Sequence, residues 1–234
     1  MTRRAEVAAN LARLRERIER ACAAVDRPAD DVRTIVVTKT FPASDVRLLA
    51  ELGVRDVGEN RHQEAVAKHQ ECRDLDLRWH FVGAVQSNKA AAVASYADVV
   101  HSIDRPKLVA ALDKGAHAAD RRVGCLVQVS LDQATGTQQG RSGADPDRVG
   151  ALAELVSRAG RLDLLGVMGV APLDGDPDKA FARLADVAAQ VRARFPAATA
   201  ISAGMSGDLE AALGRGATHV RVGTAVLGAR GAKG

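Results

Sequence analysis

The stretch TIVVTKTFP, residues 34–42, joins an apolar run to a turn that contains no glycine. The β-branched residues of TIVV predict a buried strand over residues 34–39. An open sheet that binds a dinucleotide carries a glycine-rich turn directly after its first strand, and TKTFP has none. The predicted strand also ends on Lys39, a residue type that is seldom fully buried. The stretch therefore favours another kind of parallel sheet, and it raises the question of what the amine does.

Strand-like and helix-like patterns alternate along the rest of the chain. Short apolar runs predict eight strands, at residues 34–39, 55–59, 79–83, 98–103, 125–130, 164–170, 200–205 and 219–223. Helical patterns follow the first seven of them, at residues 44–52, 60–72, 87–95, 105–119, 145–159, 177–194 and 207–215. This alternation is typical of parallel βαβ units. In a chain of 234 residues, eight such units predict an α/β fold of the closed (β/α)8 TIM barrel type, with an open doubly wound sheet as the alternative.

The start of the chain and its longest loop complete the expected architecture. Residues 3–25 carry apolar side chains at spacings of three and four, which predicts an amphipathic packing helix ahead of the first strand. Residues 132–147 are rich in Gly, Gln, Ser and Thr, so we expect a mobile loop after the fifth strand. No linker or low-complexity tract divides the chain, and residues 1–234 are therefore expected to form a single domain.

The composition excludes several classes of function. The net charge is only +4, the basic residues are mixed with acidic ones and no nucleic-acid-binding motif is present, so no nucleic-acid partner is expected. The three cysteines are far apart, which argues against a metal site or a disulfide framework and fits a reducing cytoplasm. No secretory signal and no apolar run of membrane length occur, so no membrane partner is expected. Aromatic residues make up 3% and no apolar surface stripe is evident, which favours a monomer.

In a barrel of this kind the functional residues gather where the strands end. SAGMS, residues 202–206, leads from the seventh predicted strand through a glycine into a helix for which Ser206 is a suitable N-cap, and helix starts attract anions. A second glycine turn, at Gly223, follows the eighth strand. The two turns predict a phosphate-binding cradle. Asp208 would oppose an anion there, and ordinary glycine turns are the alternative interpretation.

Lys39 suggests which phosphate compound such turns would bind. A lysine in an apolar pocket has a lowered pKa and forms a Schiff base with an aldehyde, although a lone lysine at a strand end can also simply reach into solvent. Pyridoxal 5′-phosphate (PLP) needs a lysine for its aldehyde, a phosphate cradle and a partner for its ring nitrogen. Arg221 points to the same side of its strand as Gly223 and is the candidate for that partner, because a guanidinium cannot accept a proton. The alternative for Arg221 is a salt bridge to Glu59 or another acid.

The segments VVTKTFP, VGEN, WHFVGAVQSNK, GMSGDLEAAL and VRVGTAVLGAR, which span residues 36–230, occur in the order expected of one family. Together they closely resemble the pyridoxal-phosphate homeostasis proteins (the YggS/PROSC family). The resemblance implies a barrel like the N-terminal domain of alanine racemase, with PLP held as a Schiff base by Lys39. It places Asn60 near the cofactor and Arg221 opposite the ring nitrogen. It assigns the phosphate to the two turns, with Ser202, Met205, Ser206, Gly223 and Thr224 as the residues concerned.

The resemblance also implies a PLP carrier and regulator rather than a robust enzyme, with PLP-accepting apoenzymes as candidate partners. A racemase of the alanine racemase type takes one acid/base group from a second domain, and here the chain ends just after the eighth predicted strand. A PLP-dependent amino-acid racemase of low activity is the alternative. A third candidate is a Schiff-base aldolase acting on a sugar phosphate, which would use the same lysine and turns without PLP.

A few features depart from the family pattern or leave a role open. Segment 132–143 is longer than the pattern, Arg141 stands where lysine is frequent, and GVMGVAPLDGD, residues 166–176, is a looser version of its counterpart. His80 and His101 lie at predicted strand ends, where both a structural and a catalytic role are open. The single tyrosine, Tyr96, is expected to be a packing or surface residue.

Overall fold

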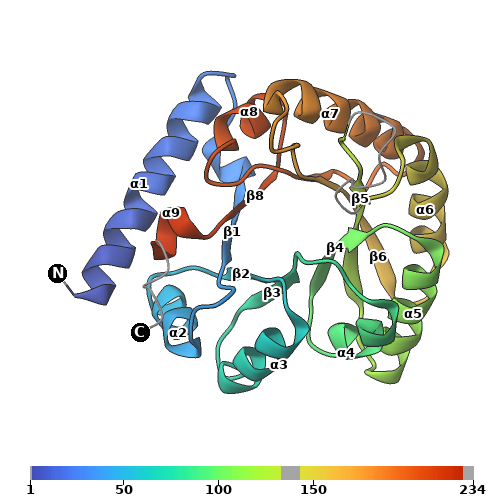
Figure 1. Ribbon diagram of the computed structural model, residues 1–234, viewed down its shortest axis with the longest axis horizontal. Helices are drawn as coiled ribbons and strands as arrows, with labels where there is room; N and C mark the ends of the chain where they lie inside the picture. Colours follow the sequence, from blue (N-terminus) through green and yellow to red (C-terminus); the bar gives the residue numbers. More distant parts are fainter. Residues whose placement is uncertain (1, 133–142, 229–234) are drawn as a thin grey trace.

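The computed structural model describes residues 2–132 and 143–228, and in them eight parallel strands close into a barrel (Figure 1). The strands are β1 (Arg33–Val37), β2 (Asp56–Glu59), β3 (Arg78–Phe81), β4 (Val99–Ile103), β5 (Val123–Val129), β6 (Leu162–Gly169), β7 (Ala200–Ser202) and β8 (His219–Val222). Each strand pairs with the next one along the chain, and β8 pairs with β1, so that Val36 lies between Val57 and Val222. The predicted (β/α)8 TIM barrel is confirmed, because an open doubly wound sheet would leave its two edge strands unpaired.

Helices alternate with the strands and surround them (Figure 1). They are α1 (Arg3–Ala23), α2 (Ala43–Glu51), α3 (His62–Glu71), α4 (Ala90–Ala94), α5 (Pro106–Ala118), α6 (Pro146–Arg158), α7 (Pro177–Arg194), α8 (Leu209–Gly214) and α9 (Thr224–Leu227), with 3-10 turns η1 (Ala29–Asp31) and η2 (Ser87–Lys89). The helices predicted from the sequence are all present, with ends close to those expected. The short helix α9 was not predicted, because four residues are too few to show a helical repeat.

The N-terminal helix α1 takes the place in the ring that a long helix after β8 would otherwise fill. It packs against α8 and α9 (Figure 1). Its buried stripe consists of Val7, Leu14, Ile18 and Cys22. These side chains share one apolar cluster with Val36 of β1 and Val222 of β8. The Asn10 side-chain amide also donates to the Val226 carbonyl of α9, 2.8 Å away. The predicted packing helix therefore covers the join between the first and the last strand.

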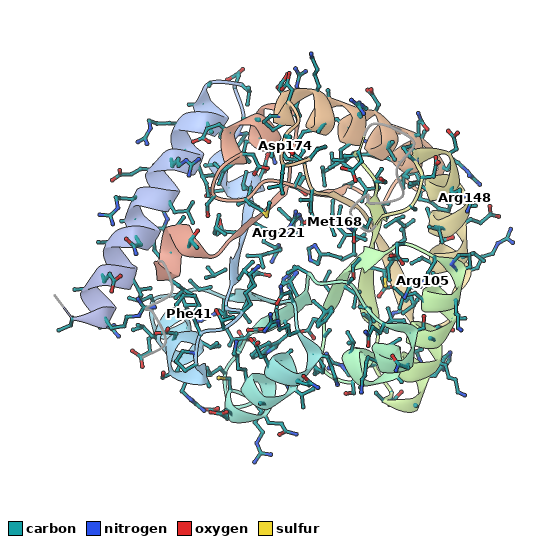
Figure 2. All side chains as sticks on the ribbon, viewed as in Figure 1. Phe41, Arg105, Arg148, Met168, Asp174 and Arg221 are labelled. Carbon is teal, nitrogen blue, oxygen red and sulfur yellow. The ribbon has the colours of Figure 1, made fainter. Side chains whose placement is uncertain are left out.

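The strands face two different environments. Outward-facing side chains such as Val57 and Trp79 pack in an apolar cluster with residues of α2. Inside the barrel the buried side chains of His80, His101, Ser202 and Arg221 form hydrogen bonds with one another. Figure 2 shows Arg221 and Met168 near the barrel centre. Barrel interiors are normally filled by branched aliphatic side chains. The polar interior found here therefore points to a functional role.

Three further sequence expectations concern parts of the chain outside this core. In the described ranges no helix is long and apolar enough to cross a membrane. Residues 133–142 of the loop expected at 132–147, Arg141 included, lie outside the described residues. Cys22, Cys72 and Cys125 are buried and form no disulfide with one another; the spacing argued against a disulfide framework, and their burial was not predicted.

Gly115 allows α5 to approach α4 closely. A Cβ atom at Gly115 would lie 2.3 Å from the Cα atom of Ala91, which cannot move without its helix. Gly115→Ala is therefore expected to lower the free energy of unfolding by about 1–3 kcal/mol, despite the higher helix propensity of alanine. Gly214→Ala, at the end of α8, is the matched control, because a Cβ atom there meets nothing within 4 Å. Urea unfolding followed by circular dichroism measures both. Equal midpoints for the two variants would contradict this close packing.

Candidate functional site

The residues proposed from the sequence lie on four neighbouring strand ends. The strands β7, β8, β1 and β2 follow one another around the barrel because β8 pairs with β1. At or after these strands lie Ser202, Met205 and Ser206 (β7), Arg221, Gly223 and Thr224 (β8), Lys39 (β1) and Asn60 (β2). Barrel closure thus brings residues from both ends of the chain to one side of the C-terminal rim.

Lys39 lies just beyond β1 and not inside it. The strand ends at Val37, Thr38 is buried, and Lys39 is exposed. The expectation of a lysine in an apolar pocket is therefore wrong, because the strand ends before Lys39 and the chain enters a turn, with Thr40 in the left-handed region at φ 69°. Within the described part of the chain the Lys39 amine makes no hydrogen bond or ion pair. The rim therefore presents an unengaged primary amine.

Two side chains of α3 hold the backbone on either side of Lys39. Lys68 Nζ donates to the Thr38 carbonyl at 2.7 Å, and the Thr40 N–H donates to Glu64 Oε2 at 2.8 Å. Glu64 and Lys68 are four residues apart and share one face of the helix. That spacing is visible in the sequence, but only the fold shows that this face meets the turn after β1. The turn is therefore fixed while the Lys39 side chain stays free.

Beneath this turn lies a buried ion pair that the sequence analysis missed. Lys68 Nζ contacts Glu59 Oε1 at 2.6 Å, and the Thr38 hydroxyl donates to the same oxygen at 2.5 Å. Glu59 Oε2 is buried and has no hydrogen-bond partner among the described residues. Burial raises the pKa of Glu59, against the opposing effects of Lys68 and Thr38. The position of Lys39 therefore depends on a charge pair held out of solvent.

The turn after β7 is built on a glycine and an aspartate. Gly204 has φ +89°, a backbone conformation that side chains other than hydrogen disfavour. Asp208 Oδ1 accepts a hydrogen bond from the Met205 N–H at 2.6 Å, which extends the turn. Helix α8 begins at Leu209 with Asp208 as its N-cap residue, so the expectation that Ser206 is the N-cap is wrong. The Asp208 carboxylate is engaged in organising the turn.

The turns after β7 and β8 meet at their tips. Thr224 Oγ1 lies 3.4 Å from Ser206 Oγ. The backbone N–H groups of Ser206 and Gly207 donate to no acceptor in residues 2–132 and 143–228. Gly223 runs close to β1, since a Cβ atom there would lie 3.2 Å from the Val37 carbonyl oxygen. Successive open N–H groups in a turn are an arrangement that binds anions in many proteins.

Arg17 of α1 also reaches this turn, although the sequence analysis did not include it. Its Nη1 donates to the Ser206 carbonyl at 2.8 Å, and its Nη2 lies 2.6 Å from Glu210 Oε2 at the start of α8. The contact with Ser206 joins residues 189 positions apart, so no local pattern could have revealed it. Arg17, paired with Glu210, therefore ties α1 to the turn after β7.

Asn60 follows β2 at the rim. Its side-chain Oδ1 is buried and lacks a hydrogen-bond partner among the described residues. Gly83, after β3, runs so close that a Cβ atom there would lie 2.2 Å from the Asn60 carbonyl oxygen. A cavity of about 250 Å³ opens beside it, with Asn60, Phe81 and Val93 in its wall. The Asn60 oxygen is therefore an available acceptor for a ligand.

Arg221 points into the barrel and is buried. Its Nη1 donates to Ser202 Oγ at 2.6 Å, and its Nη2 donates to the Gly169 carbonyl at 3.0 Å. Burial lowers the pKa of Arg221 to about 10, and the charge of Asp208 acts in the opposite direction. The salt bridge to Glu59 considered from the sequence is not formed, because that carboxylate is engaged by α3. Arg221 is therefore a buried cation held by neutral acceptors.

Two histidines continue this hydrogen bonding across the barrel. Ser202 Oγ lies 3.0 Å from His101 Nδ1, His101 Nε2 lies 2.9 Å from His80 Nδ1, and His80 Nε2 lies 2.8 Å from Asp56 Oδ1. Burial lowers the pKa of both histidines, most strongly that of His101. Both rings are therefore neutral near neutral pH. Their burial favours a structural role over direct contact with a ligand.

Comparison with known proteins agrees with this fold. Residues 9–231 match the family model for the N-terminal domain of alanine racemase, so the chain is a barrel protein of that class. The alanine racemase of Clostridium difficile, at 13% identity, shares the fold with a TM-score of 0.72, over 97% of this chain and 58% of its own.

Relatives with higher sequence identity show which family within this class the chain belongs to. The pyridoxal phosphate homeostasis protein of Mycobacterium tuberculosis is 42% identical, over 97% of this chain and 94% of its own length. PipY of Synechococcus elongatus, a structure solved with PLP bound, is 34% identical with a TM-score of 0.81, over 95% of this chain and 100% of its own. This chain belongs to the family of pyridoxal phosphate homeostasis proteins, as its five sequence segments indicated.

The buried ion pair predicts how the chain tolerates loss of Lys68. Lys68→Met leaves Glu59 buried without its cation, and we expect the free energy of unfolding to fall by about 3–5 kcal/mol. The double variant Lys68→Met/Glu59→Gln should lose less, because it removes the unpaired charge. Lys179→Met is the matched control, since Lys179 is exposed and lies 3.8 Å from Asp176; it should cost less than about 1 kcal/mol. Urea unfolding of the three variants measures these losses in the free energy of unfolding. A similar loss in the Lys68 and Lys179 single variants would refute the dependence on burial.

The buried histidines predict a pH dependence of stability. In the folded protein the pKa values of His80 and His101 are lowered, and that of His219 is lowered to about 4, each mainly by burial. The unfolded chain therefore binds protons that the folded protein does not, and stability should fall as the pH drops below about 6.5. Glu59, whose raised pKa acts in the opposite sense, reduces the effect.

This dependence is measured from urea unfolding at a series of pH values between about 7 and about 5. His101→Asn should flatten the slope by at most about 1.4 kcal/mol per pH unit, the contribution of one proton. An identical slope in the variant and the unaltered protein would show that His101 does not stay neutral on acidification.

Proposed function

We propose that this chain binds PLP as a Schiff base on Lys39 and acts in intracellular PLP homeostasis, with little or no catalysis of its own. The observation that carries the proposal is the grouping of a free amine, two open turns and a buried arginine on four adjacent strand ends. The family of the chain supports it, because the related PipY structure contains PLP.

The described residues fit the reactive end of PLP. Lys39 is exposed and unengaged, so its nitrogen can form a C=N bond with the aldehyde carbon while the aldehyde oxygen leaves as water. The two bonds from α3 hold the backbone around Lys39 in place during this exchange. The unpaired Asn60 Oδ1 on the neighbouring strand end is an acceptor that a bound cofactor could satisfy.

The turns after β7 and β8 fit the phosphate. We assign it to the turn of Met205 and Ser206, where the backbone N–H groups of Ser206 and Gly207 are open, and to Gly223 and Thr224 of the adjoining turn. Arg17, paired with Glu210, holds the first of these turns through the Ser206 carbonyl. The resemblance also gave Ser202 to the phosphate, but its hydroxyl is buried and bonded to Arg221 and His101. We therefore assign Ser202 to Arg221 instead.

We assign Arg221 to the ring nitrogen of PLP, and this role is the reason to propose little or no catalysis. When bound, PLP supplies an aldehyde for Schiff bases and a ring that can withdraw electrons. A guanidinium only donates hydrogen bonds, so Arg221 would hold the ring nitrogen unprotonated and weaken that withdrawal. Its pKa of about 10 keeps it charged at neutral pH. Such a site suits storage and transfer of the cofactor more than turnover.

The proposal extends to the domain organisation, oligomeric state, location and partners of the protein. We infer one PLP-binding domain over residues 1–234, a monomer in the cytoplasm and PLP-accepting apoenzymes as partners. The family match over residues 9–231 supports the single domain. The buried free cysteines fit a reducing compartment. Large exposed apolar side chains, Val25, Leu155, Leu173 and Met205, come from separate parts of the described chain, which supports a monomer.

No observation on the described residues favours the low-activity racemase. Tyr96 is buried between α3 and α4, with its ring stacked on that of His62 at a centroid distance of 5.8 Å. It is therefore the packing residue that the sequence suggested, and it is not an acid/base group at the strand ends.

The proposal predicts where PLP can be trapped. We expect that PLP added to the protein gives a long-wavelength imine absorbance, and that borohydride reduction leaves a pyridoxyl group on the peptide containing Lys39. Lys39→Ala should lose both signals. Lys114→Ala, an exposed lysine on α5, should keep them. Mass spectrometry of the reduced peptides locates the adduct. An adduct on Lys89 would show that the assignment to Lys39 is wrong, and a protein without the absorbance would favour the aldolase.

A further inference from the structure

Arg221 lacks the partner that a buried cation normally has. None of the ion pairs among residues 2–132 and 143–228 includes it, yet it lies inside the barrel with about 5% of its surface exposed. A buried charge without a counter-ion is costly unless hydrogen bonds compensate. Its one side-chain acceptor is the Ser202 hydroxyl, at 2.6 Å. The Ser202 hydroxyl can stabilise the Arg221 charge because it is itself hydrogen-bonded to His101, at the start of a series of hydrogen bonds that leads to Asp56.

The chain of hydrogen bonds from Arg221 to Asp56 can run in only one direction. Arg221 can only donate, and an ionised Asp56 can only accept. With neutral histidines in between, Ser202 must donate to His101 Nδ1, His101 Nε2–H to His80 Nδ1, and His80 Nε2–H to Asp56. Ser202, His101 and His80 then each accept one bond of the series and donate one. The reverse order would place a lone pair of His80 against the carboxylate.

The charges around Asp56 maintain this direction. Burial alone would raise the pKa of Asp56, but the hydrogen bond from His80 and the charges of Arg33 and Arg78 bring it below the ordinary value. Arg33 Nη1 lies 3.2 Å from both carboxylate oxygens, and Arg78 Nη1 lies 3.7 Å from one. His219 faces the same region with a pKa of about 4 and is neutral. Asp56 therefore stays ionised while the rings between it and Ser202 stay neutral.

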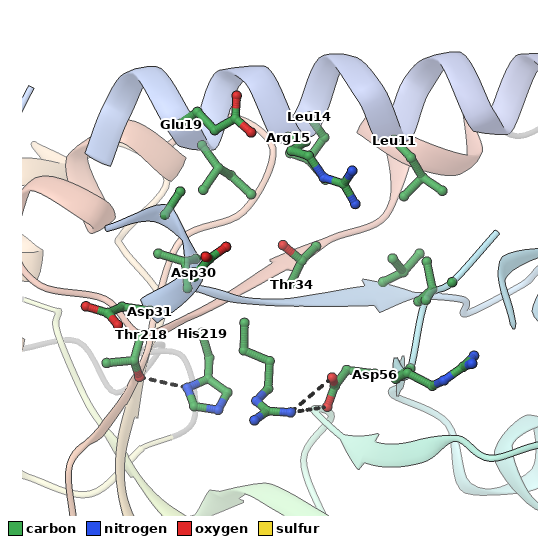
Figure 3. A pocket seen from close by; sticks show the side chains of 18 of the residues that line it. Leu11, Leu14, Arg15, Glu19, Asp30, Asp31, Thr34, Asp56, Thr218 and His219 are labelled. Carbon is green, nitrogen blue, oxygen red and sulfur yellow. Dashed lines mark hydrogen bonds and ion pairs between the residues drawn. The ribbon is translucent and has the colours of Figure 1, made fainter. Parts of the chain in front are cut away.

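Asp56 lies at the opposite end of the barrel from the proposed cofactor site. It lines a cavity of about 560 Å³ between α1 and the N-terminal ends of β1 and β2. Figure 3 shows Asp56 in this cavity together with His219, which is hydrogen-bonded to Thr218. The series thus connects the N-terminal end of the barrel with the site at its C-terminal rim.

We propose that Asp56, His80, His101 and Ser202 are positioning residues for Arg221, forming a one-directional hydrogen-bond relay that aims its guanidinium at the cofactor's ring nitrogen. This inference rests on the proposed function. Each bond in a series polarises the next, so the distant carboxylate strengthens Ser202 Oγ as an acceptor for Arg221. An acid placed directly beside the ring nitrogen could share a proton with it, whereas an acid four groups away cannot. The relay therefore stabilises the cation and keeps the ring nitrogen unprotonated.

The direction of the relay can be read without cofactor or variants. We expect long-range ¹⁵N–¹H NMR correlations of the cofactor-free protein, near neutral pH, to show both His80 and His101 protonated on Nε2 only. A proton on Nδ1 of either ring would overturn the relay.

The positioning role is tested by PLP titration of variants that circular dichroism shows to be folded. Asp56→Asn should weaken PLP binding by on the order of tenfold, the usual cost of losing a group that orients a binding residue. Ser202→Ala, at the other end of the relay, should do the same. Asp30→Asn is the matched control, because Asp30 lines the same cavity, is exposed and lies outside the relay; it should bind PLP normally.

A double variant separates positioning from a general loss of stability. Arg221→Gln should weaken binding at least as much as Asp56→Asn, and the double variant should bind no more weakly than Arg221→Gln alone, because both act through one contact. Normal binding by Asp56→Asn, or losses that add in the double variant, would overturn the inference. If the unaltered protein binds no PLP, the proposed function fails and the positioning role fails with it, while the NMR result still decides the direction of the relay.

Discussion

The pairing of β1 with β8 is the constraint on which the rest of the structure depends. Val36 lies beside Val222 on one side and Val57 on the other, so the first and last strands leave no open edge. In an open sheet these strands could lie far apart, and the turn of Lys39 would not adjoin the turn of Gly223. Helix α1 covers the join with an apolar stripe and adds Arg17 beside the turn after β7. Closure therefore creates the site as well as the core.

Some charged residues of the barrel are paired with an opposite charge, and two others have no such partner. Lys68 and Glu59 neutralise each other behind the barrel wall, and their bonds fix the backbone before Lys39. At the N-terminal end Asp56 is balanced by Arg33. Arg221 alone among these cations has no acid next to it, and the exposed amine of Lys39 has no partner among the described residues. The two groups without an opposite charge are therefore an amine and a donor-only cation, the pair on which the proposed PLP site rests.

Much of the fold and part of the site were predictable from the sequence. The alternation of short apolar runs with helical periods located every strand, because these preferences act over a few residues. The alternation of side chains along β8 predicted that Arg221 and Gly223 share one side, and the contacts of Arg221 with Ser202 and Gly169 place its side chain inside the barrel. Helix α9 and the N-cap Asp208 escaped prediction. Four residues are too few to show a helical repeat, and the residue at which a short helix begins leaves no periodic signal.

By itself the sequence determined the order of the elements, the closed parallel barrel, the family and the residue types at the strand ends. Only the tertiary structure decided that Lys39 is exposed, that Lys68 of α3 holds the turn before it, and that Ser202 serves Arg221. The reason is physical. Strand and helix patterns follow from local backbone sterics and side-chain spacing, which any short stretch reveals. Ion pairs and buried hydrogen bonds depend on which distant segments come within about 3 Å of each other, and that is set by packing of the whole barrel.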